Sequence, residues 1–448
     1  METKESNIND LTLKEIVSLA CKHVDVGAAV MPVLLFDDNA KDGYQLVTPE
    51  TLERSKEKET LYSKTLRTEF NAVVIEHHLK WSPLCETLPG PLSPMVENEN
   101  GRIDRLGRYD FYHTDLIVEY CLKHKMKIKG HVLLWHATSP LKHLERLSAP
   151  ELRDCIRQHI FTVMGHYRNK IKVWDVVNEA LSPDGALANN LFLQKLGPSY
   201  IDDAFRWAHE ADPNAFLIYN DNKVEGCGLI PTERSVKADA FYNLLKGMLE
   251  RGVPVHGAGM QAHFNAAGVG WNRCPTPRSI KAQIRRLGNL GLKVNISEMD
   301  VRASQLVEPP PGYDHKTADL EKIRTMAQRK IYHDTLAAAL TEPAFDGIWF
   351  WGVSDKHTWV TDFYYDDSPL LFDPNYKPKA HCYNAIREAL LSMVPGGTVG
   401  NGTLLDSDLD TDGRHWGHEW MGPPDQNFEL LSQRKIELKG DARPDWQL

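Results

Sequence analysis

The chain consists of short apolar runs that alternate with longer amphipathic segments as far as about residue 390. β-Branched and other apolar residues form a first run at 26–36 and further runs near Val74, Val132, Val176, Leu217, Gly259, Ile296 and Trp349. Segments with helical apolar spacing lie between these runs, for example 111–124 and 200–211. A further such segment, 10–24, precedes the first run, with Asp10 as its expected N-cap. The pattern therefore predicts eight strands that alternate with helices.

Eight strands at intervals of roughly 40 to 55 residues predict an α/β fold, a (β/α)8 TIM barrel with long loops after its strands. The alternative is a doubly wound open sheet, which would want a glycine-rich phosphate loop after the first strand, where this chain has VGAAVMP. We expect one barrel domain over residues 1–394, in which 37–60 form a loop and a short helix. Residues 395–448 are expected to be a linker and a C-terminal extension packed on the barrel.

Two of the predicted strands end in a carboxylate. The run VWDVVNEAL at 173–181 leads to Glu179, and the run LKVNISEMDV at 292–301 leads to Glu298. Burial disfavours the charged form and raises the pKa of a carboxyl group, which is how a general acid is made. Two glutamates at strand ends are the minimum for glycoside hydrolysis, in which one protonates the leaving oxygen and the other attacks or activates water. The alternative is two unrelated acids that pair with Lys or Arg.

Polar and aromatic side chains gather at the ends of the other strands. They are Glu76, His77, Lys80, His131, Trp135, Asn220, Asp221, Gln261, His263 and Trp351. Amides, carboxylates and imidazoles bind sugar hydroxyl groups, and Trp faces cover the C–H sides of sugar rings. A single His or Trp at a strand end is more often a packed core residue, but the same bias at several strand ends indicates a carbohydrate site.

Composition narrows the class of substrate. The formal net charge is −9 at pH 7 with Lys and Arg scattered, so we expect no nucleic acid and no membrane partner. Seven scattered cysteines without a CxxC pair, and strand ends without an H-x-H pair, predict no metal centre and no cofactor. The N-terminus carries no apolar leader, which predicts a cytoplasmic protein; the alternative is a secreted protein whose signal was removed.

Two motifs resemble those of glycoside hydrolase family 10, the retaining endo-β-1,4-xylanases. WDVVNEA at 174–180 resembles the acid/base motif of that family, and NISEMDV at 295–301 resembles its nucleophile motif. The resemblance runs from about Leu11 to about Leu391. It implies that Glu179 is the acid/base, with Asn178 beside it on the sugar 2-OH group, and that Glu298 is the nucleophile. A retaining enzyme would hold the two carboxyl groups about 5 to 5.5 Å apart.

Three further segments resemble sugar-binding motifs of the same family. They are GHVLLWH at 130–136, GMQAHF at 259–264 and WGVSDKHTWV at 351–360. The resemblance implies binding roles for His131, Trp135, His136, Gln261, His263, Trp351 and Trp359. His263 is expected to hydrogen-bond the nucleophile.

The chain departs from the family pattern at three positions that contact sugar. His77 in IEHHLKW replaces the Asn of PENxMKW on the non-reducing side, while Glu76 and Lys80 flank it. WHAT at 135–138 lacks the Gln of WHSQ, and NDNK at 220–223 lacks the aromatic residue of NDYN on the leaving-group side. The departures predict altered glycone binding with unchanged chemistry. The charge of His77 stays open, since Lys80 and Glu76 act on it in opposite directions.

The tail holds one weak metal-binding pattern. Its acidic residues fit the spacing of a calcium loop, D-x-D-x-D-G-x5-E, at Asp408, Asp410, Asp412 and Glu419. No amphipathic helix precedes this pattern, and Pro423-Pro424 would end any helix that follows. An acidic surface turn is therefore the favoured interpretation.

Together these patterns predict a retaining, endo-acting glycoside hydrolase that cleaves β-1,4-xylosidic bonds in xylan or xylo-oligosaccharides by double displacement. Its partner is then an oligosaccharide or polysaccharide substrate. One alternative is a β-glycosidase on the same fold with altered glycone specificity, for a glucoside or an aryl or saponin conjugate. A non-catalytic carbohydrate binder ranks last, because both glutamates are retained. The sequence does not predict the oligomeric state.

Overall fold

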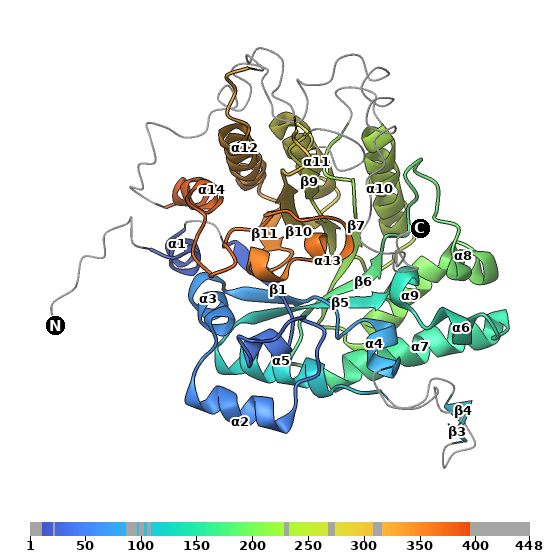
Figure 1. Cartoon of the computed structure of the whole chain (residues 1–448). Helices are drawn as coiled ribbons and strands as arrows, with labels where there is room; N and C mark the ends of the chain where they lie inside the picture. The colour runs from blue at the N-terminus through green and yellow to red at the C-terminus, as the bar shows by residue number, and fades with distance from the viewer. Residues whose placement is uncertain are drawn as a thin grey trace.

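The computed structural model describes residues 11–20, 23–86, 96–97, 103–104, 109–227, 233–267, 274–307 and 316–394. Within these residues the predicted (β/α)8 barrel is confirmed. Parallel strands follow one another in the order β11-β1-β2-β5-β6-β7-β8-β10, and β10 pairs with β11 to close the sheet. Figure 1 shows the strands at the centre of the molecule with the long helices around them.

All eight predicted strands are present in the barrel. Their bounds are β1 Asp25–Val30, β2 Ala72–Ile75, β5 Lys127–Leu134, β6 Val173–Asn178, β7 Phe216–Asp221, β8 Gly257–Met260, β10 Lys293–Arg302 and β11 Phe345–Phe350. A short strand, β9 (His263–Asn265), adds to the carboxyl end of β10. The strands β3 (Val96–Glu97) and β4 (Ile103–Asp104) form a separate antiparallel pair.

Helices connect the strands, as the sequence pattern predicts. The longer ones are α1 Leu13–Leu19, α2 Pro49–Glu57, α3 Leu61–Glu69, α5 Tyr112–Lys123, α7 Ala149–His166, α9 Ser199–Ala211, α10 Glu233–Glu250, α11 Pro277–Gly288, α12 Leu320–Leu340 and α14 Ala380–Leu391. Short helical segments are η2 Val33–Leu35, α4 Trp81–Glu86, η3 His136–Thr138, α6 Leu141–Leu144, α8 Leu191–Leu196, η5 Asp355–His357 and α13 Trp359–Phe363. Among the helices of the described ranges, none combines the length and apolar character that crossing a bilayer requires.

Two details near the start of the chain differ from the prediction. The sequence predicts one strand over 26–36, but β1 ends at Val30 and the run continues as η2. Pro32 causes the break, because it has no backbone N–H for a ladder hydrogen bond. Thr12 rather than Asp10 caps α1: its hydroxyl accepts from Glu15 N at 3.3 Å, and its own N–H donates to Glu15 Oε2 at 2.8 Å. Asp10 lies outside the described residues.

Charged side chains lie inside the barrel as well as apolar ones. Lys129 Nζ lies 3.0 Å from Asp175 Oδ1, and His131 Nδ1 lies 2.9 Å from Asp175 Oδ2. All three side chains are about 1% exposed. Removing one partner of a buried pair leaves an uncompensated charge, which costs roughly 3–5 kcal/mol. The network therefore fixes the orientation of His131 below the carboxyl ends of the strands.

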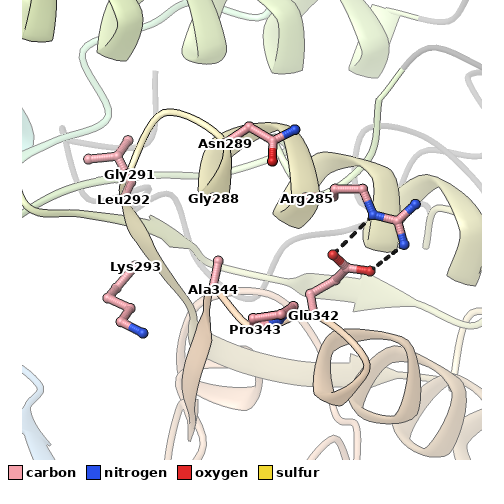
Figure 2. A pocket seen from close by; sticks show the side chains of 9 residues that line it. All are labelled: Arg285, Gly288, Asn289, Gly291, Leu292, Lys293, Glu342, Pro343 and Ala344. Atoms are coloured by element: carbon pink, nitrogen blue, oxygen red, sulfur yellow. Dashed lines mark hydrogen bonds and ion pairs between the residues drawn. The ribbon is translucent and has the colours of Figure 1, made fainter.

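A cavity of about 300 Å³ lies at the amino end of β10. Figure 2 shows its lining residues, which include Lys293 at the start of β10 and an ion pair between Arg285 and Glu342. Arg285 binds both carboxylate oxygens, at 3.2 and 2.8 Å. Charge pairing at this end of a TIM barrel serves stability, because active sites form at the opposite, carboxyl ends of the strands. We therefore expect the active site toward the other end of β10.

The close packing of β5 on β6 generates a stability prediction. Gly130 on β5 pairs with Trp174 on β6, and a Cβ atom at Gly130 would overlap the Trp174 ring. We expect Gly130→Ala to lower the free energy of unfolding by about 1–3 kcal/mol through overpacking. Gly165, inside α7, has open space around its Cβ position, so Gly165→Ala should raise it by about 0.5–1 kcal/mol. Urea unfolding of both variants tests this, and equal effects at the two sites would contradict the packing described.

Candidate active site

The two predicted catalytic glutamates lie directly after β6 and in the carboxyl-terminal half of β10. Glu179 follows the last residue of β6 and has φ +53°, a left-handed backbone conformation that residues other than Gly rarely adopt. Glu298 lies within β10, where the register with β11 shifts between Ile296 and Met299. Strained residues and bulges of this kind occur at sites where a side chain must point away from the regular ladder. Glu298 is only 5% exposed.

Asn220, at the end of β7, connects the two strands that carry the glutamates. Its Nδ2 donates to Glu298 Oε1 at 2.7 Å and to Asn178 Oδ1 at 2.9 Å, and its Oδ1 accepts from Ser297 Oγ at 2.6 Å. Gln261 completes the connection, because its Nε2 donates to Asn178 Oδ1 at 3.2 Å and to Glu179 Oε1 at 2.8 Å. Shared amides thus join both carboxylates in one hydrogen-bond network.

His263 holds the other side of Glu298. Its Nε2 lies 3.3 Å from Glu298 Oε2, as the sequence predicts, and its Nδ1 lies 2.6 Å from Asp300 Oδ2. Burial lowers the pKa of His263, but the carboxylates of Asp300 and Glu298 outweigh it and raise the pKa to about 10. Trp359 Nε1 also donates to Asp300 Oδ2, at 2.8 Å. A charged imidazole therefore lies beside Glu298 at neutral pH.

Aromatic rings and a lysine form the wall next to Glu179. Trp135 Nε1 donates to Glu179 Oε2 at 3.1 Å. The ammonium group of Lys80 lies 4.8 Å from the centre of the Trp135 ring and 5.8 Å from that of Trp351. The His131 ring packs edge-on to Trp351 at 5.3 Å, with its own orientation set by Asp175. The predicted binding residues Trp135, Trp351 and Lys80 are therefore neighbours.

The carboxyl group of Glu76 lies in the same region. Burial raises the pKa of Glu76 to about 8; Lys80 opposes this rise, and the carboxylates of Asp362 and Glu298 add to it. Burial lowers the pKa of Lys80, against the pull of Glu298, Glu76 and Glu179. A protonated Glu76 can donate a hydrogen bond to a sugar hydroxyl group, whereas a carboxylate can only accept one.

The surroundings of His77 give the direction of its pKa shift, which the sequence leaves open. Burial lowers the pKa of His77 well below its usual value, and Lys80 and His78 lower it further. The neutral ring packs edge-on against Tyr44, with the ring centres 4.8 Å apart. Tyr44 lies in the 37–60 segment, to which the sequence analysis assigns no chemistry. Through its contact with His77, Tyr44 therefore lies next to the predicted binding site for the non-reducing side of the sugar.

The predicted rise in the pKa of Glu179 is wrong. Burial does raise the pKa of Glu179, as expected, but Gln261 and Asn222 hydrogen-bond its carboxylate and the charges of Lys237 and His136 favour ionisation. The pKa is lowered as a result. Burial alone does not decide the shift, because other strands and a helix bring polar groups to this carboxylate.

Comparison with known proteins identifies the family. The model of glycosyl hydrolase family 10 matches residues 37–389. The chain belongs to glycoside hydrolase family 10. Among similar proteins, this family 10 enzyme is 34% identical over 331 residues to endo-1,4-beta-xylanase B of Thermotoga neapolitana, covering 73% of this chain and 83% of that protein. It is 31% identical to a beta-1,4-xylanase of Dictyoglomus thermophilum, covering 73% and 84%.

Solved structures of family 10 enzymes have the same fold. Xylanase 10B from Thermotoga petrophila RKU-1, solved with xylobiose, gives a TM-score of 0.66 at 30% identity and covers 86% of this chain and 98% of that one. The intracellular xylanase TsXylA from Thermoanaerobacterium saccharolyticum gives 0.64 at 29% identity, covering 84% and 99%. The chain is therefore a glycoside hydrolase with a barrel like those of these xylanases.

Several residues of this site carry no role in the sequence analysis. Asn220 and Asp221 appear there only as a strand end, although the register places Asn220 opposite Asn178. Asp300 appears only as part of a motif. Lys237, on α10, had no signal in the sequence, because its partner Asp221 lies on a different element. The calcium pattern at 408–419 and the whole 395–448 extension lie outside the described residues and stay predictions.

The charge of His263 generates a prediction for the pH dependence of stability. A pKa of about 10 in the folded enzyme, against about 6.5 for an ordinary His, means that stabilisation by His263 is complete below pH about 6.5 and is lost as the pH rises toward 10. The difference in unfolding free energy between wild type and His263→Gln should therefore shrink over that range. Urea unfolding at pH 6 to 10 measures this difference.

A second histidine serves as the control for that measurement. Burial and the charges of Lys123 and Arg67 lower the pKa of His124 in the folded enzyme, the opposite direction to His263. Its contribution to stability therefore does not decrease as the pH rises. The difference between wild type and His124→Gln should be constant from pH 6.5 to 10. A constant difference for His263→Gln as well would mean that His263 is not the cation described here.

Proposed function

We propose that this family 10 enzyme is a retaining endo-β-1,4-xylanase that hydrolyses xylan or xylo-oligosaccharides by double displacement. The similarity to proteins named xylanases supports the substrate class. The observation that carries the mechanism is the amide network of Asn220, Asn178 and Gln261, which binds Glu298 at one end and Glu179 at the other. Two carboxylates in such a network can act on the same glycosidic bond from opposite sides.

Glu298 is the nucleophile in this proposal. Its carboxylate attacks the anomeric carbon while Glu179 donates a proton to the leaving oxygen, which gives a covalent glycosyl-enzyme and frees the aglycone. Glu179 then removes a proton from water, which attacks the same carbon and restores its configuration. The mechanism requires a separation of about 5 to 5.5 Å between the two carboxyl groups, because no water has to fit between Glu298 and the sugar.

The environments of the two glutamates suit these roles. His263 and Asn220 hold both oxygens of Glu298, so one carboxylate orientation is fixed before substrate binds. The lowered pKa of Glu179 suits the second step, in which it accepts a proton. The first step needs a protonated Glu179, and a bound sugar that expels water raises the pKa of a buried carboxyl group.

Sugar binding is assigned to the residues that surround the pair. Trp135, Trp351 and Trp359 offer faces for the C–H sides of xylose rings. Glu76, Lys80 and Gln261 offer hydrogen bonds to hydroxyl groups, and Asn178 is placed to bind the 2-OH group. His77 adds a neutral imidazole on the non-reducing side, held by its contact with Tyr44.

A location inside the cell is a further part of the proposal. One of the similar structures is described as an intracellular xylanase, from Thermoanaerobacterium saccharolyticum. An enzyme in that compartment would act on short imported xylo-oligosaccharides rather than on polymer. Fractionation of the native cells, followed by activity measurements, would locate the enzyme.

The proposed roles predict different behaviour of two alanine variants. Glu298→Ala should abolish turnover of every xyloside, because no covalent intermediate can form. Glu179→Ala should lose about 10²–10⁴-fold in kcat/KM on phenyl β-xylobioside, yet keep rapid glycosylation by the 2,4-dinitrophenyl glycoside, whose leaving group needs no proton. Azide should restore turnover of Glu179→Ala and give a β-glycosyl azide.

A matched control is Glu210→Ala, since Glu210 is an exposed glutamate paired with Arg157 on the surface. This variant should keep wild-type kcat and KM on both substrates. Azide rescue of Glu298→Ala and Glu179→Ala to the same anomeric product would show that the roles are wrongly assigned. Equal losses of Glu179→Ala on the phenyl and dinitrophenyl glycosides would exclude Glu179 as the general acid.

A further inference from the structure

A buried lysine outside the assigned site lies close to Glu179. Lys237, on α10, is 2% exposed, and its Nζ donates to Asp221 Oδ1 at 2.7 Å and to Asn222 Oδ1 at 2.8 Å. A buried ammonium group is costly to desolvate and is kept only where its partners satisfy it. Asp221 is the last residue of β7 and Asn222 follows it, next to β6, which leads to Glu179. Lys237 therefore holds Asp221 and Asn222 in place at this strand end.

Asp221 connects Lys237 with the turn that follows Glu179. The hydroxyl group of Tyr219 donates to Asp221 Oδ2 at 2.6 Å, and the backbone N–H of Leu181 reaches the same oxygen at 3.3 Å. Ala180 N donates to the Tyr219 hydroxyl at 3.2 Å. The two residues after Glu179 are thus held by their backbone N–H groups. This support maintains the left-handed conformation of Glu179, at φ +53°.

Asn222 connects Lys237 with the Glu179 carboxylate itself. The ammonium group of Lys237 donates to the amide oxygen of Asn222. The NH2 group of that amide is then free to donate, and Asn222 hydrogen-bonds Glu179. In the sequence, Asn222 occupies the place of the aromatic residue in the family motif NDYN. The contact therefore depends on a residue in which this chain departs from that motif.

We propose that Lys237 and Asn222 are positioning residues for Glu179: Lys237 fixes the Glu179 turn through Asp221 and aims the amide of Asn222 at the Glu179 carboxylate. The proposal rests on the proposed function, in which Glu179 is the acid/base. Neither residue needs to touch the reacting atoms. Their effect is to hold the carboxylate in one orientation and to favour its charged form, which is the form that accepts a proton from water in the second step.

Several charged groups besides Lys237 face Glu179 and contribute to its ionisation. They are His136 from η3, Asp221 from β7 and Lys80 from the segment after β2. Burial raises the pKa of Glu179, while Lys237, Asn222 and His136 lower it. Removing Lys237 or Asn222 leaves the other groups in place. The pKa of Glu179 must then rise, and the pH profile of the enzyme must move upward with it.

The test is the pH profile of kcat/KM on phenyl β-xylobioside for the full chain and for Asn222→Ala and Lys237→Met. We expect both profiles to move to higher pH than wild type, by about 0.5 pH unit or more for Lys237→Met and by less for Asn222→Ala. At the optimum of each profile, kcat/KM for Lys237→Met should fall about tenfold on the phenyl glycoside through misplacement of the acid. On the dinitrophenyl glycoside it should fall less than about twofold, since that leaving group needs no proton.

Two further variants separate this role from a purely structural one. Lys237→Met leaves Asp221 buried without its cation and can fail to fold, so the double variant Lys237→Met with Asp221→Asn, which buries no unpaired charge, is measured beside it. Lys246→Met changes an exposed lysine on the same helix and should leave the profile of the wild type unchanged. The double variant removes a cation and an anion that both face Glu179, so its pH profile should move upward by less than that of Lys237→Met. Its kcat/KM should still fall about tenfold on the phenyl glycoside and less than about twofold on the dinitrophenyl glycoside, because the Glu179 turn has lost its support.

An unmoved pH profile in Asn222→Ala would overturn the proposal. Equal losses on the phenyl and dinitrophenyl glycosides would also overturn it, since they would indicate a structural role alone. Failure of the proposed function gives a different result, because Glu179→Ala would then lose equally on both substrates. The two outcomes are therefore distinguishable in one set of measurements.

Discussion

The site depends on a hydrogen-bond network that joins residues of β6, β7 and β10 with Gln261, which follows β8, and so connects the two carboxylates. Asn220, at the end of β7, donates to Glu298 on β10 and to Asn178 on β6. Gln261 donates to both Asn178 and Glu179 and so links these two residues. The network requires that these strands end at the same face with side chains pointing inward, and a closed parallel barrel satisfies that requirement. Charged pairs lower in the barrel hold the strands in the same register.

The two glutamates are both buried, and yet their surroundings differ in a way that suits two roles. Glu298 lies between an amide and a charged imidazole, which is fixed in turn by Asp300. Glu179 receives its hydrogen bonds from Trp135 and Gln261, together with the polar groups around Lys237. Environment rather than residue type thus distinguishes a proposed nucleophile from a proposed acid/base.

Much of the fold could be predicted from the sequence, because buried parallel strands appear as apolar runs and their spacing fixes the barrel. Both glutamates could be found in the same way, as carboxylates at the ends of such runs. The end of β1 could have been placed from Pro32 alone, since proline stops a ladder. The direction of the pKa shift at Glu179 could not, because it depends on Gln261, Lys237 and Asn222 together. Lys237 comes from α10 and meets the end of β7 only in the folded chain, which no local pattern records.

The most direct test of the account is the identity of the residue that forms the covalent intermediate. A 2,4-dinitrophenyl xylobioside with fluorine in place of the 2-OH group next to the reacting carbon should glycosylate the enzyme quickly and hydrolyse slowly, so the adduct accumulates. Mass spectrometry of the digested protein then locates the label. The account predicts one label per chain, on Glu298. A label on Glu179 or on any other residue would contradict it.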